Sequence, residues 1–220
     1  MRPLALFDLD GTLVDRKAAF DAWAGEFAAD HHLDEAALTF MVMADAHHSG
    51  PMDGYFTTIR ETFGLAEAPD ALWRQYRRRM PELAACRADD LDALRRLRGA
   101  GWRIGIVTNG MADNQLGKIR NTGLSDLVDA WGISGELGVR KPDPQIFRRV
   151  AERCGTDLDR GGWMIGDNLV HDVAGGHAAG LRTIWLHPRR HPAPWSFTGP
   201  APDFTVGSVA DAVAVLLRDH

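Results

Sequence analysis

Hydrophobic positions along the chain fall into short runs, each followed by turn residues and then by an amphipathic segment. The runs are the length of buried strands and lie at 4–8, 103–109, 129–134, 162–167 and 182–186, with a last short one at 203–206. Helical periodicity fills the intervals between them, as in 89–101, 141–155 and 208–218. This alternation predicts an α/β fold, in which a doubly wound, mostly parallel, Rossmann-like sheet is covered by helices on both faces.

One long stretch, from about residue 16 to residue 84, interrupts the alternation. It contains no convincing strand, and Phe20, Trp23 and Phe27 recur at spacings of three and four, which is typical of a helix with one buried face. We therefore expect three segments: a core segment over 1–15, an inserted all-helical domain over 16–84, and the rest of the core over 85–220.

Polar residues that can support chemistry follow several of the predicted strands. In an open parallel sheet, ligands bind at the carboxyl ends of the strands, so residues from distant parts of the chain meet there. The candidates at this edge are Asp8, Asp10, Thr108, Asn109, Lys141, Asp167 and Asp172.

Composition narrows the range of partners. The formal net charge is −5, which gives no support for nucleic-acid binding and means that an anionic ligand must be held by local groups. The two cysteines have no metal-binding spacing and are expected to be reduced thiols. We find neither a signal-peptide pattern nor an apolar run long enough to span a bilayer, and we expect a cytoplasmic protein without membrane or nucleic-acid partners. The oligomeric state is not predicted.

Four motifs, taken in order, resemble those of the haloacid dehalogenase superfamily. They are "DLDGT" at 8–12, "VTNG" at 107–110, "RKPDPQIF" at 140–147 and "GDNLVHDVAGGHAAG" at 166–180. The resemblance covers the whole predicted core, and the helical insert resembles the cap that some members carry between the first and second motifs. It implies a phosphatase-type hydrolase.

The acidic residues predict a metal site on physical grounds as well. Asp8, Asp10, Asp167 and Asp172 repel one another when they converge, and a hard divalent cation relieves this repulsion. Oxygen ligands beside a phosphate favour Mg²⁺, with Asp8 and Asp167 as ligands and Asp172 close behind. The resemblance adds the backbone carbonyl of Asp10 as a further ligand.

The same residues suggest a reaction. We expect Asp8 to be a carboxylate nucleophile that forms an aspartyl-phosphate, and Asp10 to act as general acid and then general base. Thr108, Asn109 and Lys141 are expected to bind the phosphate, through a hydroxyl, backbone N–H groups and a positive charge respectively.

Several functions remain open at this stage. The preferred one is hydrolysis of a phosphomonoester of a small soluble metabolite, and a phosphosugar mutase would use the same intermediate. A haloacid dehalogenase would have no use for Asp10, and a non-enzymatic phospho-aspartate receiver would be about half as long and without a cap. The natural substrate is not predicted. The stretch 47–54 is expected to be a loop between two helices, and His47 and His48 within it are candidates for substrate contact, with a plain solvated turn as the alternative.

Overall fold

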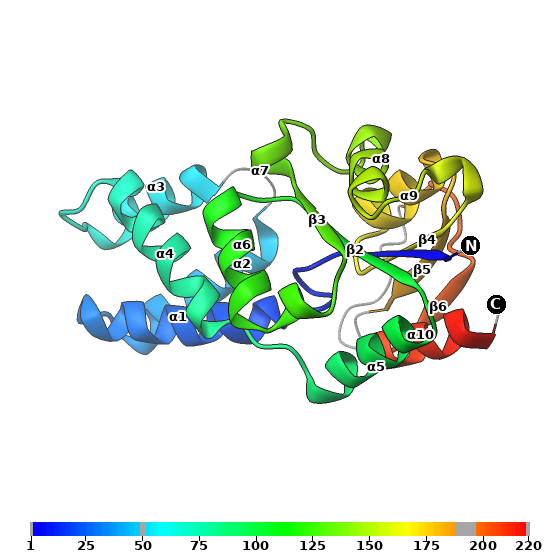
Figure 1. Cartoon of the computed structure of the whole chain (residues 1–220). Helices are drawn as coiled ribbons and strands as arrows, with labels where there is room; N and C mark the ends of the chain where they lie inside the picture. The colour runs from blue at the N-terminus through cyan, green and yellow to red at the C-terminus, as the bar shows by residue number, and fades with distance from the viewer. Residues whose placement is uncertain (1, 49–51, 188–196, 219–220) are drawn as a thin grey trace. The chain divides into compact units, whose positions relative to one another are not determined.

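The computed structural model describes residues 2–48, 52–187 and 197–218. The chain divides into two compact units, one made of Met1–Asp15 with Ala85–His220 and the other of Arg16–Ala84. We call these the sheet unit and the helical unit, and describe each by itself (Figure 1).

In the part of the chain that the structure describes, the sheet unit is built on six parallel strands in the order β3-β2-β1-β4-β5-β6. Their bounds are β1 Leu4–Phe7, β2 Arg103–Thr108, β3 Ala130–Ile133, β4 Trp163–Gly166, β5 Arg182–Leu186 and β6 Phe204–Val206. All four residues of β1 are buried, as expected for a central strand covered on both faces. The predicted doubly wound α/β fold is confirmed.

The register of the central strands explains why the polar residues meet. Phe7 at the end of β1 pairs with Ile106 of β2 on one side and with Ile165 of β4 on the other. The three strands therefore end nearly level, and the residues that follow them emerge at one edge of the sheet.

Helices cover both faces of this sheet. In Figure 1, α5 and α10 lie side by side below the strands, and α8 and α9 lie above them. The helices of the unit are α5 Ala88–Gly99, α6 Ala112–Asn121, α7 Ser134–Leu137, α8 Pro144–Arg153, α9 Gly175–Ala178 and α10 Val209–Arg218. Shorter elements are the 3-10 helices Leu124–Asp126 and Leu158–Arg160 and the π-helix Leu169–Ala174.

Close packing of α8 on the strands depends on a small residue in β2. A Cβ added to Gly105 would lie 2.7 Å from Leu6 Cδ2 and 2.9 Å from Val150 Cγ1. Leu6 and Val150 belong to the same buried cluster as Phe147 of α8. The glycine thus leaves room for helix side chains to reach the centre of the sheet.

The helical unit contains α1 Arg16–Asp30, α2 Glu35–His47, α3 Met52–Phe63 and α4 Pro69–Leu83. Its core is aromatic: the ring centroids of Trp23 and Tyr76 are 5.0 Å apart, and Phe20, Phe27 and Phe56 are buried around them. The predicted all-helical character is confirmed for the described residues of this unit, and Phe20, Trp23 and Phe27, recognised from their spacing, are buried in α1.

One segment, 47–54, differs in part from expectation. The stretch 47–54 was expected to be a loop, but His47 is the last residue of α2 and α3 begins at Met52, while 49–51 lie outside the described residues. Within the described ranges, no helix is both long and apolar enough to cross a membrane.

Candidate active site

A tight turn follows β1 and carries both aspartates of the first motif. The backbone N–H of Asp8 donates to the carbonyl of Ile165, which ties the end of β1 to β4. The chain then turns at Gly11, whose φ of +84° suits a residue without a side chain. A Cβ there would also lie 2.3 Å from Asp167 Oδ2. The glycine therefore allows the turn to pass directly beside the carboxylate of Asp167.

Lys141 lies between two carboxylates in the buried part of the site. Its Nζ donates to Asp8 Oδ1 at 2.5 Å and to Asp172 Oδ1 at 2.6 Å, and the lysine is only 3% exposed. Asn109 holds the backbone that carries this lysine: its Nδ2 donates to the Lys141 carbonyl at 3.0 Å, and its Oδ1 accepts from the Lys141 N–H at 2.9 Å. The loops of the second and third motifs are thus joined by an amide side chain, a function of Asn109 that the sequence did not indicate.

Three of the predicted metal-binding residues converge. Asp8, Asp167 and Asp172 each offer a carboxylate oxygen, and these oxygens lie within 4.8 Å of one another. Asp172 comes from the π-helix, and its Oδ2 accepts from the Asn168 N–H at 3.0 Å. A Cβ on Gly166 would lie 2.2 Å from Asp172 Oδ2, so the missing side chain of this glycine leaves room for the Asp172 carboxylate.

Burial and mutual repulsion set the electrostatics of this group. Burial raises the pKa of Asp8 well above its ordinary value; Lys141 opposes the rise, and Asp172 and Asp167 add to it. Burial and then the charge of Asp172 raise the pKa of Asp167 to about 7. Burial alone would lower the pKa of Lys141, but Asp172 and Asp8 raise it above its ordinary value. Three crowded carboxylate oxygen donors, with raised pKa values at Asp8 and Asp167, are the environment that a hard divalent cation stabilises, so these residues fit Mg²⁺.

The side chain of Asp10 has different partners. Lys118 Nζ lies 2.7 Å from Asp10 Oδ1 and 2.8 Å from Oδ2, and Gln115 Nε2 donates to Oδ2 at 2.9 Å. Gln115 Nε2 also donates to Thr108 Oγ1 at 2.7 Å. Thr108, predicted to bind phosphate, is therefore connected to Asp10 through one amide.

Lys118 and Gln115 were missed in the sequence. Both lie on α6, three residues apart, and both are buried. Their spacing places them on one face of the helix, next to the buried Ile119. A lysine on that apolar face was the available signal, because an unpaired lysine is rarely buried.

The two histidines proposed for substrate contact lie in the helical unit. His47 Nδ1 is 2.7 Å from the Met43 carbonyl, one turn earlier in α2, and the His48 ring centroid is 5.9 Å from that of Tyr55. Their contact with a substrate stays a prediction.

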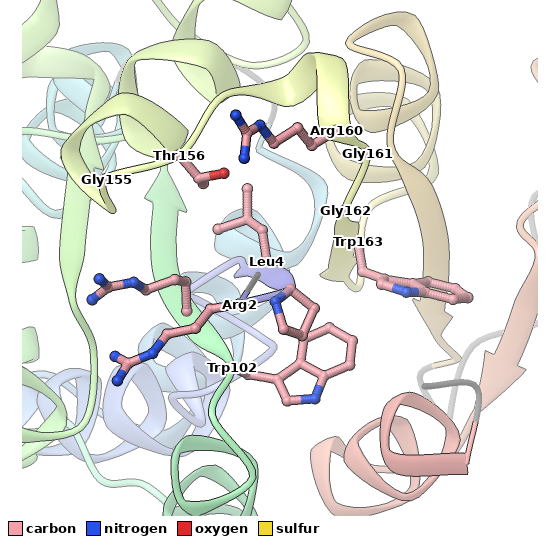
Figure 2. Close-up of a pocket in the computed structure, with 11 residues that line it drawn as sticks. Arg2, Leu4, Trp102, Gly155, Thr156, Arg160, Gly161, Gly162 and Trp163 are labelled. Carbon is pink, nitrogen blue, oxygen red and sulfur yellow. The ribbon is translucent and has the colours of Figure 1, made fainter.

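A cavity of about 480 Å³ opens at the opposite edge of the sheet (Figure 2). Arg2 and Leu4 line it at the start of β1, together with Trp102, Arg103 and Arg160. Arg103 is paired with Asp129 at 2.9 Å and Arg160 with Asp157 at 3.3 Å, so both guanidinium groups already have counter-ions. None of the predicted catalytic residues lines this cavity, which is therefore distinct from the candidate active site.

Known proteins resemble this chain along most of its length. The family model of the haloacid dehalogenase-like hydrolases matches residues 3–180. The pyrimidine 5'-nucleotidase YjjG of Escherichia coli is 29% identical over 96% of both chains, and the pyrophosphatase PpaX of Bacillus pumilus is 26% identical over 97% of this chain and 96% of its own.

A solved structure gives the same result for the fold. The HAD-hydrolase YfnB of Bacillus subtilis superposes with a TM-score of 0.75 at 23% identity, over 99% of this chain and all of the other. The family and the enzyme class predicted from the four motifs are thus confirmed. The chain belongs to the haloacid dehalogenase-like hydrolase family.

Proposed function

We propose that this enzyme hydrolyses phosphomonoesters of a small metabolite, with Mg²⁺, through an aspartyl-phosphate on Asp8. The observation that carries the proposal is the set of charged groups around the carboxylate of Asp8. Its carboxylate lies at the end of a central strand, 2.5 Å from Lys141 Nζ and grouped with Asp167 and Asp172. Asp10, a second acid, follows two residues later on the same turn.

Two half-reactions with opposite proton demands follow from this arrangement. A carboxylate oxygen of Asp8 forms a bond to phosphorus while the ester P–O bond breaks, and Asp10 gives a proton to the departing alkoxide. Asp10 then takes a proton from water as the water oxygen attacks the same phosphorus. The bond between phosphorus and Asp8 breaks, which frees the carboxylate and releases inorganic phosphate.

Charge stabilisation is divided between the protein and the cation. Asp8, Asp167 and Asp172 would hold Mg²⁺, and a bound Mg²⁺ supplies positive charge that offsets the repulsion between these carboxylates and an incoming phosphate. Lys141 contributes a fixed charge next to the nucleophile, and Thr108 a hydroxyl proton for a phosphoryl oxygen.

The relatives support a small phosphorylated substrate without identifying it. Their names include a pyrimidine 5'-nucleotidase, a phosphoserine phosphatase matched over 54% of this chain, and a pyrophosphatase. The substrates in these names differ in size and charge and share a phosphorus–oxygen bond to be broken. We propose that the helical unit is a cap that selects among such substrates.

The assignment of Asp8 is tested by the Asp8→Asn variant. We expect it to fold like the wild type and to lose turnover of 4-nitrophenyl phosphate, because an amide is not a nucleophile for phosphorus. Asp92→Asn, at an exposed carboxylate of α5, is the matched control and should keep full activity. Retained turnover in Asp8→Asn would reject the assignment.

Product analysis with a sugar phosphate and with a 2-haloacid separates the alternatives. A hydrolase releases one inorganic phosphate for each ester consumed, whereas a mutase returns the phosphate to the sugar. Release of halide from a 2-haloacid would instead indicate a dehalogenase.

A further inference from the structure

Lys118 is a buried charge that the proposed reaction leaves without a function. It is 2% exposed, on α6, and its ammonium group contacts both carboxylate oxygens of Asp10, which is itself 20% exposed at its side chain. A buried ion pair of this kind is weak evidence for stability, because the desolvation of two charges offsets their attraction. The geometry of the ion pair is better explained by its effect on Asp10, whose carboxyl group the ammonium group holds in one position.

Gln115 constrains two groups at once. Its Nε2 donates to Asp10 Oδ2 at 2.9 Å and to Thr108 Oγ1 at 2.7 Å. A hydroxyl oxygen that accepts from an amide keeps its single proton for another partner. The hydroxyl proton of Thr108 is therefore left to donate elsewhere, as phosphate binding requires.

The chain makes room for this amide. A Cβ on Gly110 would lie 2.8 Å from Gln115 Cγ, and Gly110 has a φ of +153°. The "VTNG" motif thus ends in a residue whose missing side chain gives Gln115 its position.

We propose that Lys118 and Gln115 are positioning residues, which hold the carboxyl group of Asp10 where it exchanges protons with the leaving group and with water. This inference rests on the proposed phosphatase function. Lys118 Nζ reaches both oxygens of Asp10, so one oxygen can carry a proton while the other still accepts from the ammonium group. Lys118 and Gln115 can therefore hold the carboxyl group of Asp10 in both half-reactions.

Leaving-group dependence tests the first half-reaction. The measured quantity is kcat/KM, which reports only steps up to departure of the alcohol. We compare phenyl, 4-nitrophenyl and 2,4-dinitrophenyl phosphate, whose leaving groups need a proton to decreasing degrees. Lys118→Met should lower kcat/KM for phenyl phosphate by about 10²-fold or more, the usual contribution of a general acid. For 2,4-dinitrophenyl phosphate the loss should stay below about threefold, because this leaving group departs as an anion.

A rapid-mixing experiment tests the second half-reaction. With 2,4-dinitrophenyl phosphate, Lys118→Met should release a burst of dinitrophenol close to one per active site, followed by slow turnover. The aspartyl-phosphate still forms in this variant, but Asp10 is poorly placed to take a proton from the water that hydrolyses it.

Combined variants show whether Lys118 acts through Asp10. In the Asp10→Asn background, Lys118→Met should change kcat/KM for phenyl phosphate by less than about threefold, because residues that act as a unit are not additive. Gln115→Met is an independent second variant, which should show the same steeper leaving-group dependence. Lys17→Met, which removes an exposed lysine paired with Asp21, is the matched control and should behave as the wild type.

Two results would overturn the inference while the proposed function stands. They are an equal loss with all three esters, in variants whose circular dichroism shows a native fold, or additive effects of Lys118→Met and Asp10→Asn. If the wild type hydrolyses none of the esters, the proposed function fails, and the positioning of Asp10 fails with it.

Discussion

Gly11 shows how much of the site depends on a single missing side chain. Its φ is +84°, and a Cβ there would lie 2.3 Å from Asp167 Oδ2. The backbone conformation and the close approach are separate demands, and Gly123 meets only the first.

Gly11→Ala should therefore lose turnover, whereas Gly123→Ala should keep it. Gly123 has a φ of +74° with no atom within 4 Å of a built Cβ, so it shares the strain without the collision. Both variants should lose about 1 kcal/mol of unfolding free energy from the strained φ, measured by urea titration. Turnover of 4-nitrophenyl phosphate should drop only in Gly11→Ala, and equal activities would show that the approach to Asp167 does not matter.

The raised pKa of Asp167 predicts that the stability of the metal-free protein depends on pH. Its pKa is about 7 in the fold against an ordinary 3.8. Between these values the folded state keeps a proton that the unfolded chain has lost, so this contribution is fully present at low pH and is lost as pH rises towards 7. Asp167→Asn cannot ionise, and its stability relative to wild type should rise with pH.

The measurement is urea unfolding in excess EDTA, at about pH 5 and about pH 8, for wild type, Asp167→Asn and the exposed control Asp92→Asn. Only Asp167→Asn should gain stability relative to wild type at the higher pH. An unchanged difference between the two pH values would contradict the burial argument.

At the scale of single residues, the sequence predicted the polar residues within the four motifs but not the residues that hold their side chains in place. Asp8, Asp167 and Asp172 follow from strand ends and motif order, and the fold brings their oxygens together. Lys118 was missed because a lysine in a helix is normally solvated. Only the folded chain shows that α6 turns this one inward against Asp10.

Among the elements, strands were predicted better than the helix ends. The β-rich runs correspond to β1 through β6 with small differences at their ends, since a buried parallel strand reads as a continuous apolar run. The stretch 47–54 was expected to be a loop because it contains glycine, proline and polar residues. In the structure α2 continues through His47, whose Nδ1 bonds the Met43 carbonyl at the helix C-terminus. Side-chain capping of this kind is decided by local geometry, which composition does not report.

For the molecule as a whole, Mg²⁺ should act as a ligand that stabilises the native state. A cation that binds only folded protein adds about 2.7 kcal/mol at a hundredfold excess over its Kd. We expect Mg²⁺ to raise the Tm of wild type, and to have little effect on Asp172→Asn, which lacks one of the three grouped carboxylates. Sodium at the same ionic strength is the control for screening.

Chelation gives the matching activity test. Excess EDTA should abolish turnover of 4-nitrophenyl phosphate by the whole enzyme, and added Mg²⁺ should restore it. Full activity without divalent metal would contradict the cation argument made from the crowded carboxylates.

The position of β1 in the sheet also bears on how the protein is made. β1 leaves the ribosome well before its neighbours β2 and β4, which begin only at Arg103 and Trp163. The nascent chain must therefore carry an apolar strand with two unpaired edges while the next 95 or so residues are synthesised. The aromatic core of the helical unit draws only on residues 16–84 and can close during that interval. Asp8 is thus synthesised well before Lys141, Asp167 and Asp172, and the proposed active site can assemble only after the fourth motif has been translated.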